Sequence, residues 1–255
     1  MGKTIQSLER GLVILNIMGK AKKPLLLNEI AEHFDIDRSS VFRLVSTLVK
    51  NRYVNQNPDT KQYTLGNRIL ELSGAFSDSS YIESLIRPVL KSVLLKTQQN
   101  THLAILDGQE VVFLAVEQPN DPITLNISVG TREPSIATAL GKSLLAFLEP
   151  QKLDSFLAGT NLIQYTPKSI KTIAGLKKEL AKVRKNRLAF DNEEYRSGIN
   201  CFAAPIFNHQ NNVPYSIGIS GLRDIVKPHI EEYGEIVRLA GIEASELLGH
   251  TSGDV

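Results

Sequence analysis

The most constraining feature of the sequence is the segment from Arg38 to Asn51, in which apolar and polar residues separate at helical spacing. The apolar face repeats at intervals of three and four residues and consists of Val41, Leu44, Val45, Leu48 and Val49. The opposite face carries short hydroxyl side chains and arginine, without the Glu–Lys pairs of an ordinary solvent-exposed helix. Short side chains let a helix approach a DNA groove closely, and arginine binds guanine edges or phosphates. The segment therefore predicts a DNA-recognition helix.

The residues before this helix predict two more helices. In the first helix, Leu8, Leu12 and Leu15 form one apolar stripe, and further apolar residues widen it. The second helix, within 27–34, places apolar residues at positions 0, 3, 4 and 7. Asp37 precedes the recognition helix, where its carboxylate can accept hydrogen bonds from unpaired backbone amides. The order helix, helix, capped helix is typical of a helix-turn-helix.

The residues after the recognition helix predict a hairpin that completes a winged helix-turn-helix. Short extended segments at 53–54 and 62–65 surround the turn sequence Asn57-Pro58-Asp59-Thr60-Lys61, so that Lys61 lies at the tip of the wing. Lys61 is expected to touch phosphate or the minor groove. The expected major-groove contacts are Arg38, Ser39, Ser40, Arg43 and Thr47. The alternative is a small helical packing domain that binds no DNA.

The distribution of charge agrees with DNA binding by the first part of the chain. Residues 1–75 carry 11 Lys and Arg against 7 Asp and Glu, whereas the other 180 residues carry 18 against 20. Only the first part is therefore expected to meet a polyanion such as double-stranded DNA. Because one such module is small, two copies on a near-palindromic operator are expected, as a homodimer or a dimer of dimers. The apolar first helix, with Ile5, Ile14 and Ile17, offers a dimer surface or a deeper core against the hairpin.

A small polar stretch at residues 73–80 lies between two helical patterns and predicts a joint. The expected organisation is a winged helix-turn-helix domain over 1–66, a linker helix over 67–80, and a larger domain over 81–250. In the larger domain, strands are expected at 102–106, 111–117, 124–128, 199–207 and 215–220, and helices at 82–96, 139–147, 170–185 and 230–247. This alternation indicates a mixed α/β (α+β) domain with an antiparallel sheet.

Several motifs together resemble the IclR family of bacterial transcriptional regulators. In the first domain these are Ser7-Leu8-Glu9-Arg10-Gly11-Leu12, Leu27-Asn28-Glu29-Ile30-Ala31, the helix from Arg38, and Tyr63-Thr64-Leu65-Gly66. The more specific motifs are Phe190-Asp191-Asn192-Glu193-Glu194 and Gly198-Ile199-Asn200-Cys201-Phe202-Ala203-Ala204-Pro205-Ile206. The resemblance covers nearly the whole chain and implies a GAF-like α/β effector domain after the winged helix-turn-helix. It also implies a cytoplasmic transcriptional repressor whose DNA affinity depends on a small organic or aromatic carboxylate.

The resemblance also implies an effector site, composed of Ala139, Leu140, Asp191, Cys201, Gly218 and Ser220. Thr138 is expected to cap the helix that begins there. The sequence departs from the family at Gly218, where a hydroxyl residue is common, and the loss of this donor is expected to make room in the pocket for a ligand of different shape. It also departs at Glu133, where an apolar residue is expected. If Glu133 faces the pocket, it disfavours a carboxylate effector unless Arg132 or Lys142 offsets it.

Simpler explanations remain open for several of these residues. Cys201 lies between apolar neighbours and is also explained as a small core residue. Asp191 is also explained as a turn residue or an ion-pair partner. Glu193 and Glu194 are expected to pair with Arg196 at the surface.

The sequence lacks the local signatures of catalysis and of metal binding. Gly141-Lys142-Ser143 ends like a P-loop, but Ile136 stands where the first glycine is required. The histidines have no metal-ligand spacing, and one cysteine allows no internal disulfide. No apolar run approaches the length of a membrane span. We therefore expect no cofactor, no metal, no membrane contact and no enzymatic activity. The alternatives are a DNA-binding assembly protein without an effector and a catalytic sensor domain.

Overall fold

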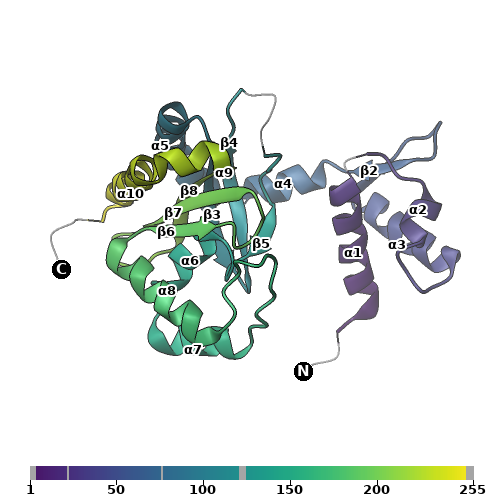
Figure 1. Ribbon diagram of the computed structural model, residues 1–255. Helices are drawn as coiled ribbons and strands as arrows, with labels where there is room; N and C mark the ends of the chain where they lie inside the picture. Colours follow the sequence, from purple (N-terminus) through teal and green to yellow (C-terminus); the bar gives the residue numbers. More distant parts are fainter. Residues whose placement is uncertain (1–3, 22, 76, 121–124, 251–255) are drawn as a thin grey trace. The chain divides into compact units, whose positions relative to one another are not determined.

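The computed structural model describes residues 4–21, 23–75, 77–120 and 125–250. The chain divides into two units, Met1–Ser80 and Tyr81–Val255 (Figure 1). None of the helices in these described ranges combines the length and the apolar character of a membrane-spanning segment. Each unit is built around cores of its own.

The smaller unit has the predicted order of three helices followed by a hairpin. Its helices are α1 (Gln6–Ala21), α2 (Leu27–Ala31) and α3 (Arg38–Lys50), and its antiparallel strands are β1 (Val54–Gln56) and β2 (Tyr63–Leu65). Leu25 adds a bridge to Tyr63, since each backbone amide of this pair donates to the carbonyl of the other. The core comprises Ile14, Met18, Leu25, Ile30, Val41, Val45, Val54 and Tyr63. The predicted winged helix-turn-helix is therefore confirmed.

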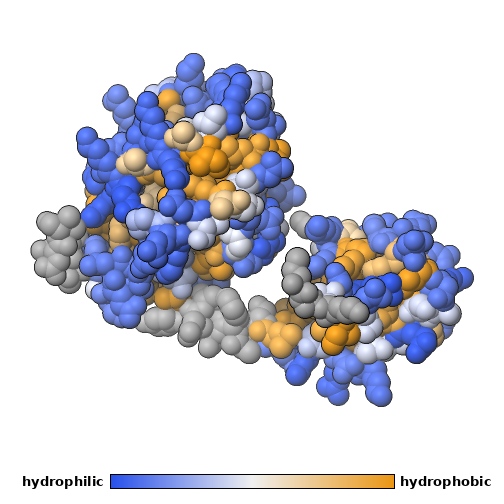
Figure 2. All heavy atoms as spheres, turned by 90° about the horizontal axis from the view of Figure 1, so that it is seen from below, coloured by the Kyte–Doolittle hydropathy of each residue, from blue (hydrophilic) through white to orange (hydrophobic). Residues whose placement is uncertain are grey.

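The buried face of α1 differs from the predicted one. Leu8 and Leu12 are 61% and 54% exposed, whereas Ile14 is fully buried. The helix turns its Ile14–Met18 side toward α3 and the hairpin, so Leu8 and Leu12 lie at the surface, whereas Leu15 is partly buried against the core. Ile14 therefore belongs to the core and not to a dimer surface, while Ile5 is 68% exposed. Apolar side chains are visible at the surface of both units in Figure 2.

Two helices connect the hairpin to the large sheet. Helix α4 spans Arg68–Ala75 and α5 spans Ser77–Thr97, and residue 76 between them lies outside the described residues. The prediction of helix on both sides of the small polar stretch is therefore confirmed. In its second half, α5 buries Ile86, Val89, Leu90 and Val93 against the sheet of the larger unit.

The larger unit contains one six-stranded antiparallel sheet in the order β5-β4-β3-β8-β7-β6. The strands are β3 (Asn100–Asp107), β4 (Glu110–Glu117), β5 (Arg132–Pro134), β6 (Ala189–Asn192), β7 (Ile199–Ile206) and β8 (Tyr215–Leu222). Helices α5 and α10 (Ile230–Leu247) cover one face, and α6 (Ala139–Leu145), α7 (Pro150–Ala158) and α8 (Ile173–Asn186) cover the other (Figure 1). The short helix α9 (Arg223–Val226) follows β8. The predicted α/β fold class is confirmed.

The strand expected at 124–128 is wrong. Residue 124 lies outside the described residues, and 125–128 form no strand. The carbonyl oxygens of Leu125 and Ile127 accept hydrogen bonds from the side-chain amides of Asn100 and Gln118, at 3.0 and 2.8 Å, instead of pairing with a neighbouring strand. On the side away from β3, β4 pairs with β5. The sequence pattern did not reveal β5 because this strand has only three residues.

Candidate functional site

The N-terminus of α3 has the predicted cap. The carboxylate of Asp37 accepts hydrogen bonds from the Ser40 amide at 2.9 Å, from the Ser40 hydroxyl at 2.7 Å, and from the Ser39 hydroxyl. These bonds hold the pKa of Asp37 well below its usual range. The two serine hydroxyls thus donate to the cap, so they present mainly acceptor lone pairs to any other partner.

The exposed side of α3 carries arginines without an ion-pair partner. Arg38 and Arg43 are both exposed, and within the described ranges neither guanidinium forms an ion pair or a hydrogen bond. The Thr47 hydroxyl donates to the Arg43 carbonyl oxygen at 2.8 Å. Phe42 lies beside them with half of its surface exposed. An uncompensated cationic surface on a winged helix-turn-helix suits a phosphate-bearing partner.

Lys61 occupies the wing turn between β1 and β2. The Asn57 side-chain oxygen accepts hydrogen bonds from the amides of Asp59 and Thr60, at 2.9 and 3.0 Å, and this closes the turn. Lys61 follows with a left-handed φ of 57° and is exposed. The turn therefore exposes the Lys61 side chain in the hairpin turn, where the sequence predicts the tip of a wing.

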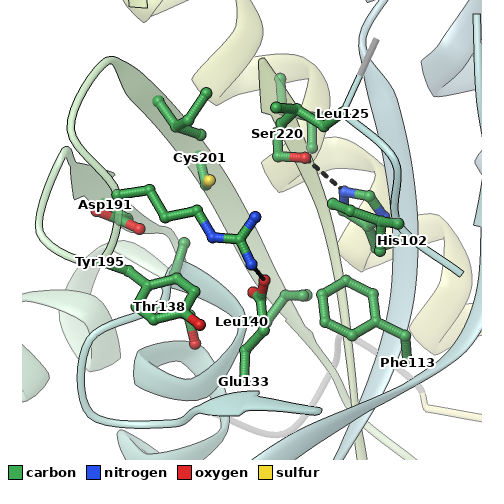
Figure 3. A pocket seen from close by; sticks show the side chains of 15 residues that line it. His102, Phe113, Leu125, Glu133, Thr138, Leu140, Asp191, Tyr195, Cys201 and Ser220 are labelled. Atoms are coloured by element: carbon green, nitrogen blue, oxygen red, sulfur yellow. Dashed lines mark hydrogen bonds and ion pairs between the residues drawn. The ribbon is translucent and has the colours of Figure 1, made fainter. Parts of the chain in front are cut away.

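The larger unit has a cavity on the face of the sheet that α6 covers (Figure 3). It encloses about 440 Å³, including space open to solvent, and is lined by His102, Phe113, Leu125, Ile127, Glu133, Thr138, Ala139, Leu140, Asp191, Tyr195, Arg196, Ile199, Cys201, Ile219 and Ser220. Five of the six predicted effector residues are in this lining. The exception is Gly218, which is buried in β8 beside Leu140.

Gly218 is explained by backbone packing and not by extra room for a ligand. A Cβ atom at this position would lie 2.4 Å from the Phe202 carbonyl oxygen and 3.2 Å from Leu140 Cδ2. The first distance is far below van der Waals contact, so a side chain would force β7 and β8 apart. The expectation that Gly218 enlarges the pocket is therefore wrong.

Helix α6 begins at the cavity with the predicted Thr138 cap. The Thr138 hydroxyl oxygen accepts a hydrogen bond from the Gly141 amide at 3.3 Å and donates to the Pro134 carbonyl at 3.0 Å. Ala139 and Leu140 are the first helical residues, and both line the cavity. Backbone amides in the first turn of a helix have no intrahelical partner, so they are available to a ligand acceptor.

Glu133 faces the cavity, and the cation that offsets its charge was not among those predicted. Arg196 donates to it, with Nη2 3.0 Å from Glu133 Oε1. Burial raises the pKa of Glu133, and the charge of Arg196 opposes this rise. Arg132 points to Asp107 and Glu110 instead. The sequence could not reveal the Arg196 pair because the two residues are 63 positions apart.

Asp191 and Cys201 face each other across the β6–β7 pairing. Asp191 Oδ1 accepts a hydrogen bond from the Glu194 amide at 2.6 Å, which gives it a turn role as well as a place in the cavity. Burial raises the pKa of Asp191 to about 7, against the opposing charge of Lys142. Burial, followed by the charge of Asp191, raises the pKa of the Cys201 thiol well above its usual range. Cys201 is therefore a neutral, weakly nucleophilic wall residue.

His102 and Ser220 form a neutral polar pair on another side of the cavity (Figure 3). His102 Nε2 lies 2.7 Å from Ser220 Oγ, although the two residues are 118 positions apart. Burial lowers the pKa of His102 to about 3, so the imidazole is uncharged at neutral pH. Its Nδ1 atom is buried without a hydrogen-bond partner in the described structure. No local signal could identify His102, since only the β3–β8 pairing brings it to Ser220.

The Gly141-Lys142-Ser143 run has a structural role. Lys142 is fully buried, and its Nζ donates to the Phe190 carbonyl at 2.6 Å and to Glu194 Oε1 at 2.5 Å.

The two glutamates after β6 do not pair with Arg196. Glu194 pairs with Lys142, and Glu193 pairs with Lys168 and with Arg223. The predicted surface pairing of Glu193 and Glu194 with Arg196 is therefore wrong, because the turn after β6 directs these two carboxylates away from Arg196.

Within the described residues, no group of three or more His, Cys, Asp or Glu side chains could hold a metal ion. The arrangement thus consists of an exposed cationic helix in one unit and a mostly apolar cavity with a few polar groups in the other. A cavity of this kind is typical of reversible binding of a small molecule.

Comparison with known proteins places both units in one family. The model described as the IclR helix-turn-helix domain matches residues 7–58, and the model described as the C-terminal part of the bacterial transcriptional regulator IclR matches residues 75–245. The HTH-type transcriptional regulator XynR of Escherichia coli K12 is 31% identical, over 96% of this chain and 98% of the relative. The transcriptional repressor IclR of the same strain is 26% identical, over 96% and 90%.

A solved structure has the same fold. An IclR homologue from Microbacterium hydrocarbonoxydans, complexed with 4-hydroxybenzoate, superposes with a TM-score of 0.84 at 20% identity, over 96% of this chain and all of that one. The curated relatives named above are transcriptional regulators and not enzymes.

Proposed function

The chain belongs to the IclR family of bacterial transcriptional regulators, and on this premise we propose that it is a repressor released from its operator by a small carboxylate effector. DNA binding and transcriptional regulation follow from the family itself. The nature of the effector, the direction of the response and the residues of both sites are the proposal. The observation that carries it is a mostly apolar cavity with a few polar groups in the larger unit of a chain whose smaller unit binds DNA.

The DNA contacts are proposed from the exposed side of α3. Arg38 and Arg43 are exposed and unpaired within the described residues, so no internal ion pair must break when they meet DNA. Ser39, Ser40 and Thr47 are short and allow close approach of the helix. Lys61 would touch the backbone from the wing. Two copies on a near-palindromic site, as a dimer or a dimer of dimers, would supply the contact area that one module lacks.

The effector site is proposed to lie in the cavity at the start of α6. Ala139 and Leu140 offer backbone amides, while Asp191, Cys201 and Ser220 offer polar side chains in its wall. The 4-hydroxybenzoate of the Microbacterium homologue supports a carboxylate as the class of ligand. The repressor named among the relatives supports repression as the output. A ligand produces such a response only if it binds one arrangement of the regulator more tightly than the other.

The DNA part is tested by replacing one residue of each proposed kind. Arg43→Ala should weaken binding to the preferred duplex by about 1–3 kcal/mol and reduce discrimination between sequences, because a groove contact reads bases. Lys61→Ala should weaken binding to all duplexes about equally and reduce the salt slope by about 1, because a phosphate contact reads none. Competition titrations with a preferred duplex and a random duplex measure both effects.

These two variants serve as controls for each other, since each removes one exposed positive charge from the same unit. If Arg43→Ala kept the full discrimination between preferred and random DNA, Arg43 would not read bases. If both variants left all DNA binding unchanged, the exposed side of α3 and the wing would not be the DNA-binding surface.

A further inference from the structure

The cavity wall contains a cationic side chain that already forms an ion pair with a carboxylate of the same protein. Among the described residues that line it, Arg196 alone has a permanently charged cationic side chain. Its guanidinium donates to Glu133. Glu133 belongs to the cavity wall itself, as Figure 3 shows. An acidic ligand that binds Arg196 must therefore reach it while Glu133 is bound to it.

Glu133 and Arg196 differ in exposure and in how firmly they are held, and this difference favours replacement of Glu133 by a ligand carboxylate. The Glu133 side chain is 10% exposed, whereas that of Arg196 is 50% exposed. Glu133 is fixed in β5, whose pairing with β4 holds its backbone. Arg196 follows β6 and contacts Glu133 through one nitrogen, while its guanidinium lies 5.0 Å from the centre of the Tyr195 ring. A guanidinium has five N–H donors, so it retains donors for a second carboxylate.

We infer that the effector's carboxylate takes the place of Glu133 on Arg196, so that Glu133 acts as an internal competitor that sets the affinity and selectivity of the cavity. This inference rests on the proposed effector function and assigns to it a ligand-binding cation, Arg196, and a specificity-determining residue, Glu133. The ligand class is a small carboxylate with a hydroxyl group. The acid binds at Arg196, and the hydroxyl reaches the neutral polar pair of His102 and Ser220.

Replacement of Glu133 by the ligand's carboxylate is expected to be accompanied by the uptake of a proton. A second carboxylate at Arg196 repels the Glu133 carboxylate, which is mostly buried in the wall, and burial already raises the pKa of Glu133. When the ligand anion replaces it, Glu133 takes up a proton from solvent and stays neutral in the wall. The other titratable and charged groups of the cavity wall come from β3, β6, β7 and the segment after β6; they are His102, Asp191, Cys201, Tyr195 and Arg196. Lys142 of α6 acts on Asp191 and Cys201 from behind this wall. Asp191 also titrates near neutrality, so a Glu133 variant must be compared with the wild type at each pH.

The test is calorimetric titration of the full chain with three probes, lactate, gluconate and 4-hydroxybenzoate. Glu133→Gln should tighten binding of the probe that binds wild-type protein by about tenfold, because the competing charge is gone. Repeating the titration in two buffers of different ionisation enthalpy counts protons. The wild type should take up about one proton per ligand near neutral pH, and Glu133→Gln clearly fewer.

Glu110→Gln is the matched control. Glu110 lies on β4 and pairs with Arg132 at 2.6 Å on the exposed side, so this variant also removes a carboxylate from an arginine but not from the cavity. It should leave both the affinity and the proton count unchanged.

The outcomes distinguish the inference that Glu133 competes with the ligand from the proposal that the effector is a carboxylate. If a probe binds the wild type and Glu133→Gln equally well, or binds the variant more weakly, Glu133 is not a competitor and only this inference fails. If no probe binds the wild type, Glu133→Gln or Glu110→Gln, while all three melt as folded proteins, the carboxylate effector itself is wrong and both claims fail.

Discussion

Replacing Lys142 with methionine should lower the free energy of unfolding of the larger unit by about 3–5 kcal/mol, the usual cost of breaking a buried ion pair from one side. Lys142 is fully buried, and its ammonium group neutralises Glu194, which is 12% exposed, beside the buried Asp191. Methionine fills similar space but leaves both carboxylates without their cation. The melting temperature of the larger unit should fall by about 10 °C, since 1 kcal/mol corresponds to about 2–4 °C at this size.

Two comparisons separate charge from packing in this result. Lys177→Met removes a lysine from the exposed pair with Asp154, and an exposed pair contributes at most about 1 kcal/mol, so the melting temperature should hardly change. Lys142→Met combined with Glu194→Gln should recover part of the loss, because the unpaired charge is then gone. If Lys142→Met melted like the wild type in circular-dichroism scans, Lys142 would not be the cation that stabilises this turn.

Asp191→Asn should stabilise the protein above neutral pH and have little effect in acid. The pKa of Asp191 is about 7 in the folded chain, above its value in an unfolded chain, because of burial. Between about pH 4 and pH 7 the folded state therefore holds a proton that the unfolded state has lost, and stability falls as pH rises through this range. The fall contributed by this one group is about 4 kcal/mol, at 1.36 kcal/mol per pKa unit.

Asparagine keeps the side-chain oxygen that accepts from the Glu194 amide, but it carries no charge. The stability of Asp191→Asn should therefore exceed that of the wild type at about pH 8, and the two should converge near pH 4. Urea denaturation at a series of pH values measures the difference. A constant difference across the series would mean that Asp191 does not titrate in this range, and its buried environment would need another explanation.

The sequence was sufficient for the smaller unit because its structure depends on local patterns. The recognition helix follows from apolar spacing, its start follows from a carboxylate at the cap, and the wing follows from a turn rich in Asn, Pro and Asp. The wrong assignment of the buried face of α1 also comes from reliance on local patterns. Apolar residues surround that helix, so spacing alone did not decide between the Leu8 side and the Ile14 side.

The cavity was less predictable because its polar pairs are long-range. Asp191 and Cys201 came from motifs, but Arg196 joins Glu133 and His102 joins Ser220 only through the sheet order. Strands β5 and β6 have three and four residues, too few for a clear alternation. The burial of Lys142 was also invisible, since a lysine normally lies at the surface.

The central claim is that a carboxylate bound by the larger unit changes the affinity of the smaller unit for DNA. The most direct measurement selects a preferred duplex from random DNA and titrates it with the full chain at fixed salt, with and without lactate, gluconate or 4-hydroxybenzoate. The matching amides, lactamide, gluconamide and 4-hydroxybenzamide, are the controls. The account predicts a preferred sequence and a release by at least one acid that weakens binding by about 5–150-fold, with no release by its amide. Equal DNA affinity with and without every acid, or equal release by acid and amide, would contradict it.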